Sequence, residues 1–255
     1  GRIVATYETS LYDETGARRP DFGLAELFGV SARATRGQPE RNAYLRVEPF
    51  PGGGVHPLAA GLEDAGRIIA GVRRVEVEPR EPGPFPLALV PSYPDLPMEK
   101  VYPREEPREP GAVARDTGPG RVVYLPGDLD RTFYEVMAQD QGRVLANAVR
   151  WALDERPAVE VTGPGLLDLA VWTLPRGLAV HLVNLTNPFA MRGPARELLP
   201  LAGLTVSARL PPGARVKEAR WLAADAPAAV TVADERLTAA APAVLDHEVL
   251  AVEFA

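Results

Sequence analysis

The residues after Pro157 form a run of short apolar or alternating segments, and this run limits the fold more than any other feature of the chain. Turn residues such as Pro175-Arg176-Gly177 and Pro211-Pro212-Gly213 separate the segments, and no helical periodicity occurs among them. Many short strands with regular turns are typical of an antiparallel β-sandwich. We therefore predict a C-terminal sandwich domain over 158–255. Its expected strands are Val159 to Thr162, Leu166 to Thr173, Leu178 to Leu185, Leu204 to Leu210, Val216 to Leu222, Ala229 to Val232 and Glu248 to Phe254.

The first half of the chain, residues 1–157, has a different pattern. Apolar residues recur every three or four positions from about Gln139 to Asp154, which predicts an amphipathic helix. A short helix is expected at Phe22 to Phe28, with Asp21 as N-cap and Gly29 as its end. The proline-dense stretch from Pro91 to Pro110 predicts an extended loop. Strands are expected at Arg2 to Thr6, Tyr44 to Val47, Arg73 to Glu78 and Leu87 to Val90, with a hairpin of Ala112 to Arg115 and Arg121 to Leu125 around the turn DTGPG.

The apolar run RIVAT has the form of a strand that is buried on both faces of a parallel sheet. Parallel strands need long crossovers, usually helices, and this half supplies one long helix and one short one. We therefore expect an incomplete α/β domain whose other strands and helices belong to a missing upstream segment of a longer polypeptide. The start GRIVAT, which lacks a methionine, agrees with that expectation.

Composition excludes several classes of function. The chain has no cysteine, so disulfides, thiolate nucleophiles and cysteine metal sites are ruled out. It has 28 Lys and Arg against 34 Asp and Glu, and no dense basic cluster, which argues against a nucleic-acid partner. No apolar run approaches the ~20 residues of a membrane helix, so we expect no membrane partner and a cytoplasmic location. No cofactor motif occurs, and the three histidines are too widely spaced for a metal pattern.

Five segments of the sequence resemble parts of known domains. GRIVATYETSLYDETGARRPDFGLAELFGV resembles the middle of the β-galactosidase trimerisation domain, which is flavodoxin-like and related to class I glutamine amidotransferases. GRVVYLPGDLDRTFYEV and the helix GRVLANAVRWALDE continue the match. GLAVHLVNLTNPFAMRGP and VLDHEVLAVEFA are similar to the C-terminal β-domain of uncharacterised glycoside hydrolases of the same group, related to family-42-type β-galactosidases.

The resemblance implies a bacterial parent protein with an upstream (β/α)8 barrel that holds the catalytic carboxylates. None of that barrel is present, so no catalytic residue can be assigned, and we expect this region to be inactive alone. The related amidotransferases use a cysteine nucleophile, which this chain lacks, so glutaminase activity is excluded. The implied role is non-catalytic and architectural: the region would support a homo-oligomer and wall the active-site entrance.

Polar residues follow two of the predicted strands of the first half. Loops at the carboxyl ends of neighbouring parallel strands meet at the ligand crevice of such sheets, so these residues could form a ligand-binding or interface site. The alternative is structural: Asp128 or Asp130 caps a turn, Asp13 begins a turn that ends at Gly16, and Glu8 pairs with Arg18, Arg19 or Arg131. The candidate residues are Glu8, Tyr12, Asp13, Asp128, Asp130, Arg131 and Tyr134.

Two other functions stay open. A carbohydrate-binding module would present Trp172 and Trp221 as an exposed, coplanar pair, although buried tryptophans are the commoner outcome in such strands. A small carboxylate-dependent hydrolase would need two of the acidic residues to face each other in a pocket. Of the histidines, we expect His181 to be a hydrogen-bonded core residue and His56 to serve a turn.

Overall fold

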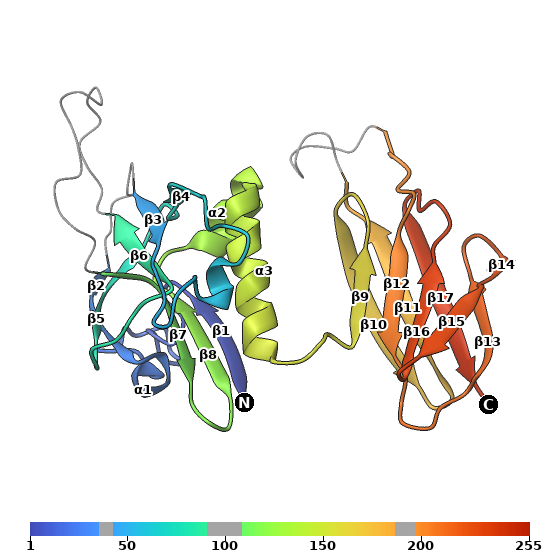
Figure 1. Cartoon of the computed structure of the whole chain (residues 1–255), viewed down its shortest axis with the longest axis horizontal. Helices are drawn as coiled ribbons and strands as arrows, with labels where there is room; N and C mark the ends of the chain where they lie inside the picture. The colour runs from blue at the N-terminus through green and yellow to red at the C-terminus, as the bar shows by residue number, and fades with distance from the viewer. Residues whose placement is uncertain (36–42, 91–108, 187–196) are drawn as a thin grey trace. The chain divides into compact units, whose positions relative to one another are not determined.

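The computed structural model describes residues 1–35, 43–90, 109–186 and 197–255 (Figure 1). Most of its regular structure is β-strand, with few helices, and it divides into two compact units, 1–156 and 157–255. No described helix is both long and apolar enough to cross a bilayer. Most of the expected Pro91 to Pro110 loop lies outside the described residues.

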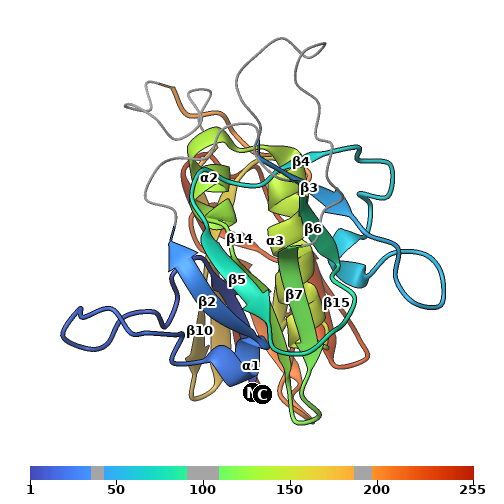
Figure 2. The same cartoon turned by 90° about the vertical axis from the view of Figure 1, so that its left-hand side faces the viewer.

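The first unit is built on a six-stranded mixed sheet with the order β1-β8-β7-β6-β3-β4. Only the β1–β8 pair is parallel, and every other pair in this sheet is antiparallel. The antiparallel strands β2 and β5 pair separately and lie side by side in Figure 2. The strands are β1 (Arg2–Thr6), β2 (Val30–Thr35), β3 (Tyr44–Val47), β4 (Ile68–Ile69), β5 (Val75–Pro79), β6 (Leu87–Val90), β7 (Pro110–Asp116) and β8 (Arg121–Leu125).

Strand β8 is fully buried on both faces, whereas β1, for which we expected this, is covered only in part: Val4 packs against one cluster, and Ile3 and Ala5 lie at the other. Val123 and Leu125 point into one apolar cluster, and Val122 and Tyr124 point into another on the opposite face. β1 lies at the edge of the described sheet, and Ala5 is its single buried residue. A strand covered on both faces must lie between two packed layers, and β8 meets that condition.

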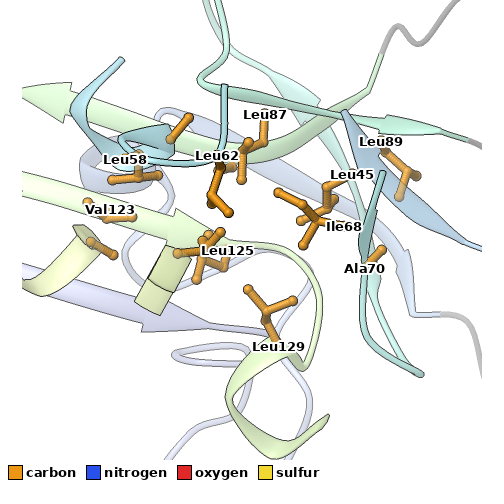
Figure 3. Packing of buried hydrophobic residues seen from close by; sticks show 14 of the residues in the cluster. Leu45, Leu58, Leu62, Ile68, Ala70, Leu87, Leu89, Val123, Leu125 and Leu129 are labelled. Carbon is orange, nitrogen blue, oxygen red and sulfur yellow. The ribbon is translucent and has the colours of Figure 1, made fainter. Parts of the chain in front are cut away.

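The two clusters have different covers. Helix α3 (Gln139–Leu153) packs on the face of Val123 and Leu125, and Figure 3 shows leucine side chains from β3, β6 and the segment around Leu58 converging on Leu125. On the other face, the stacked rings of Phe28 and Tyr124 lie 4.5 Å apart, and Phe22 meets both rings edge-on.

The helices differ from the prediction at their ends and in number. α3 agrees with the expected amphipathic helix, but α1 is shorter than expected (Ala25–Phe28). Gly29 ends α1 in the left-handed conformation, as expected, whereas Asp21 does not cap it. The Asp21 carboxylate instead accepts the backbone N–H groups of Phe22 and Ala32, at 2.8 and 2.7 Å. Two further elements were not predicted: α2 (Leu129–Val136) and the 3₁₀ helix η1 (Pro57–Ala59).

The second unit contains two antiparallel sheets with the orders β10-β11-β17-β13-β14 and β15-β16-β12-β9. Buried residues from both sheets, including Val180, Val206 and Leu250, form one core cluster, which is the arrangement of a β-sandwich. The strands are β9 (Val159–Thr162), β10 (Leu167–Leu174), β11 (Gly177–Asn184), β12 (Thr205–Arg209), β13 (Val216–Trp221), β14 (Ala226–Pro227), β15 (Val230–Ala233), β16 (Arg236–Ala240) and β17 (His247–Phe254).

Each of the seven expected strands of this unit has an observed counterpart, while β14 and β16 were not predicted. Trp221 is buried in the core, with 3% of its surface exposed. Trp172 is 62% exposed on the edge strand β10, so the expectation of a buried core residue is wrong for it. His181 is hydrogen-bonded, as expected, but it lies on the outward face of its sheet rather than in the core.

Candidate functional site

The parallel strands β1 and β8 end side by side, with Thr6 in register with Leu125. The segments that follow them are joined by two hydrogen bonds. The backbone N–H of Tyr7 donates to the carbonyl of Leu125 at 2.8 Å, and Thr6 Oγ1 donates to Asp130 Oδ2 at 3.0 Å. The fold therefore brings the acidic residues after the two strands to one edge of the sheet.

The chain leaves β1 through a constrained turn. Tyr7 and Ser10 have φ angles of +49° and +65°, in the left-handed region that few residues other than glycine occupy. The hydroxyl of Tyr124 fixes this turn, because it donates to the Tyr7 carbonyl at 2.6 Å. Burial raises the pKa of Tyr7, and the neighbouring negative charge of Glu8 adds to that rise. The Tyr7 phenol is therefore held in its neutral, protonated form.

The remaining polar residues of this turn bond to each other. Tyr12 Oη donates to Glu8 Oε1 at 3.2 Å, so a tyrosine is the described partner of Glu8 where we had considered an arginine. Asp13 does begin a turn, since the N–H of Gly16 donates to its carbonyl at 3.0 Å. The Asp13 carboxylate also accepts the hydroxyl and N–H of Thr15 and the N–H of Ala17, and these bonds lower its pKa.

Asp128 is the buried member of the group, with a side chain that is 4% exposed. Its Oδ1 accepts the backbone N–H groups of Val72 and Arg73, both at 2.8 Å. The approach is so close at Gly71 that a Cβ there would lie 2.7 Å from Asp128 Oδ1. Asp128 thus ties the loop before β5 to the end of β8. Its second oxygen, Oδ2, has no hydrogen bond and lies 3.8 Å from the Arg131 guanidinium.

The other three candidate residues lie on α2. Asp130 is in its first turn, and Arg131 Nε donates to Glu135 Oε1 at 3.1 Å, one helical turn further on. Tyr134 is 62% exposed. The site therefore has an inner part, where Asp128 holds backbone, and an outer rim of Glu8, Tyr12, Asp130 and Tyr134 that water can reach.

Backbone hydrogen bonds engage two of the candidate carboxylates. Glycosidic acid and base chemistry needs two carboxylates facing each other about 5 to 9.5 Å apart across a substrate. The carboxylates of Asp13 and Asp128 already accept backbone N–H groups. Three cavities of the described chain, around Gly1, Leu174 and Ala158, are lined by residues other than the candidates. Among the described residues, no group of three or more His, Cys, Asp and Glu side chains could hold a metal ion.

The sequence reasoning overlooked three residues that shape the site. Thr6 holds Asp130, Tyr124 holds the Tyr7 carbonyl, and the N–H of Arg73 binds Asp128. Thr6 and Tyr124 are the last or next-to-last residues of adjoining parallel strands, a position that signals such a role. No sequence signal pointed to Arg73, because its contribution comes from the backbone.

Comparison with solved structures identifies proteins of similar fold. No protein-family model matches the sequence, and no curated protein matches it. The structure is similar to α-L-fucosidase isoenzyme 2 from Paenibacillus thiaminolyticus, with a TM-score of 0.70 and 17% identity. The likeness is one of fold. It covers 100% of this chain and 37% of the fucosidase chain, so both units here have counterparts in one part of a larger glycoside hydrolase.

Two β-galactosidases also match nearly all of this chain with a minor part of their own length, at lower similarity. The enzymes from Rahnella sp. R3 and Bacillus circulans sp. alkalophilus match with TM-scores of 0.52 and 0.51 and identities of 13% and 12%. The matches cover 99% and 98% of this chain, and 28% of each enzyme. This chain therefore spans well under half the length of the solved enzymes that it resembles.

Proposed function

We propose that this chain is a non-catalytic, ancillary region of a glycoside hydrolase whose catalytic barrel lies in another part of the same polypeptide. The observation that carries the proposal is the match of the entire chain, both units together, to 37% of an α-L-fucosidase chain. Similarity over the whole of one chain and a minor part of the other is what an accessory region produces. The hydrogen bonds of Asp13 and Asp128 support the same reading, because both carboxylates already accept backbone N–H groups.

The proposal has a finer part, which concerns the first unit. We assign it as a partial flavodoxin-like domain of the trimerisation type that supports a homo-oligomer. The parallel β1–β8 pair covered by α3 supports this assignment, since a parallel pair with a helix on its face is the repeating unit of such domains. The exposed rim of Tyr12 and Tyr134 supports an interface, because tyrosine is enriched in subunit contacts.

Light scattering of the purified chain tests the architectural role. We expect a mass above that of the 27.4 kDa monomer, with dissociation promoted when Tyr12 and Tyr134 are both changed to serine. The matched control is Leu245→Ser, which alters a 50% exposed side chain in the other unit. A monomer at every concentration, or equal dissociation in the control, would contradict a role for this rim in oligomer formation.

Carbohydrate binding is the second candidate, and one observation favours it. Trp172 is 62% exposed, and its neighbour in register on β11 is Ala179, so the indole stands above its surroundings and could stack on a sugar ring. The paired platform that we considered is absent, because Trp221 is buried. Titration with fuco- and galacto-oligosaccharides tests this role: binding that is lost in Trp172→Ala would support it, and unchanged intrinsic fluorescence would refute it.

A further inference from the structure

Two of the three histidines of this chain meet on the outward face of the five-stranded sheet of the second unit. His181 lies on β11 and His247 on β17, where Val183 pairs with His247 and His181 pairs with Val249. The two histidines are therefore diagonal neighbours on one face of an antiparallel pair, at a separation that long side chains can bridge. Val180 and Leu182, which flank His181, point the other way into the core.

The two imidazoles approach each other edge to edge. His181 Nδ1 lies 3.1 Å from His247 Nε2, while the ring centroids are 5.3 Å apart and the ring planes differ by 19°. The centroid separation exceeds the nitrogen separation by about two ring radii, so the two nitrogens lie close to the line between the centroids. One of the two nitrogens must donate a hydrogen bond and the other must accept it. A single proton therefore lies between two nitrogens, each of which can carry a lone pair in one of the tautomers of its ring.

We propose that this pair is a binding site for a divalent transition-metal ion that prefers imidazole ligands, such as Zn²⁺, Ni²⁺ or Cu²⁺. Metal–nitrogen bonds of ~2.0 to 2.1 Å separate two ligand nitrogens by about 2.9 Å at a right angle and about 3.3 Å at a tetrahedral angle. The observed 3.1 Å lies between these values. The ion takes the place of the shared proton, and the ring that carried this proton stays neutral by taking up a proton from water on its other nitrogen. Both rings turn so that their lone pairs point at the ion. Water supplies the remaining ligands.

The composition of the chain makes this pair stand out. There is no cysteine, and the third histidine, His56, is buried with Nδ1 accepting the N–H of Leu58 at 3.1 Å. No third side chain of the described residues joins the pair to make a closed, structural site. The two acids next to His247 in the sequence are engaged with backbone: Asp246 Oδ1 accepts the N–H of His247, and the Glu248 carboxylate accepts the N–H groups of Ala223, Ala224 and Val249. The site is thus an open one with two protein ligands, and we expect Cu²⁺ to bind more tightly than Ni²⁺ or Zn²⁺.

Titration of the full chain, produced without a histidine tag, with Zn²⁺ and Ni²⁺ in a non-chelating buffer tests the proposal. We expect one equivalent of saturable binding that weakens between pH 7.5 and pH 5, because protons compete for the nitrogens. The side-chain NMR signals of three histidines suffice to locate the ion. Ni²⁺ should broaden those of His181 and His247 and leave those of His56 sharp.

Substitutions complete the test. His181→Gln and His247→Gln should each weaken binding at least tenfold, because even the loss of a residue that only hydrogen-bonds to a metal ligand has an effect of about that size. The double variant should abolish binding. The matched control is Asp234→Asn, an exposed acid in the turn between β15 and β16 of the other sheet, which should leave the affinity unchanged. Circular dichroism checks that each variant is folded. No saturable binding to the wild type, binding that survives the double substitution, or an equal loss in the control would overturn the proposal.

Discussion

At the scale of single residues, the acidic group at the ends of β1 and β8 separates into members that hold the fold and members that face water. Asp128 is 3% exposed and binds two backbone amides, whereas Asp130 is exposed and holds one threonine hydroxyl. Two carboxylates two positions apart in the sequence therefore have different roles. Burial and the type of donor, neither of which is visible in the sequence, decide between them.

Alanine substitutions at these two aspartates test that distinction. Asp128→Ala leaves the N–H groups of Val72 and Arg73 without their acceptor and should lower the free energy of unfolding by about 3 kcal/mol. Asp130→Ala, the matched control, should change it by no more than about 0.5 kcal/mol. Urea denaturation followed by circular dichroism measures both. Equal effects would mean that Asp128 has no special structural role.

His56 gives the fold a dependence on pH. It lies between the rings of Phe50 and Trp151, each with its centroid 5.0 Å away, and burial followed by the charge of Arg121 lowers its pKa. The unfolded chain therefore takes up a proton more readily, near the ordinary value of about 6.5. The contribution of His56 to stability is complete above that pH and declines as the pH falls through 6.5 toward the lower folded pKa.

The variant His56→Asn isolates this effect. Asparagine can still accept the N–H of Leu58 but does not titrate, and His181 and His247 are present in both proteins. We expect the wild type to lose more stability than the variant between pH 7 and pH 5 in urea titrations. Parallel stability profiles for the two proteins would contradict the assignment.

At the scale of elements, alternation predicted the strands of the sandwich well because their buried residues repeat every second position. In β11, Val180 and Leu182 are in the core and His181 is on the outward face, although we expected His181 in the core, because alternation alone does not tell what covers each face. Trp172 shows the consequence. β10 is an edge strand, so its outward tryptophan has no layer above it, while Trp221, on β13, points into the core.

The elements that the sequence reasoning missed have weak local signals. Only Leu129 and Thr132 are buried on α2, so its apolar stripe is too short to show a helical period. β16 reads RLTAA, which has little β propensity, and it forms because β12 and β15 pair with its two sides. The sequence predicted the β7–β8 hairpin, but it did not predict that β6, β3 and β4 continue the sheet in antiparallel pairs.

The two sandwich tryptophans provide a test at this scale. Trp221→Ala removes a large core side chain and should lower the free energy of unfolding of the second unit by about 3 to 5 kcal/mol. Trp172→Ala should cost no more than about 1 kcal/mol, because its indole is mostly in water. Thermal or urea denaturation of the two variants compares them directly. A larger loss for Trp172→Ala would show that the indole is packed in solution.

At the scale of the whole molecule, the account rests on the fold match and on what the acidic residues already bind. Both units match parts of glycoside hydrolases that are far longer than this chain. The sequence predicted the sandwich and the acidic edge of the first sheet, and the resemblance of its segments predicted a likeness to glycoside hydrolases, the class of the similar solved structures. It could not predict which carboxylates would be free, because that depends on loop 70–73 reaching Asp128 across the fold.

The most direct measurement is the turnover of aryl α-L-fucosides and aryl β-D-galactosides by the purified 255-residue chain. The account predicts no hydrolysis above the buffer blank, because it places the catalytic barrel in another part of the polypeptide. Reproducible turnover by the wild type that falls in Glu8→Gln or Asp130→Asn, with the fold intact by circular dichroism, would contradict it and would place a catalytic site in this chain.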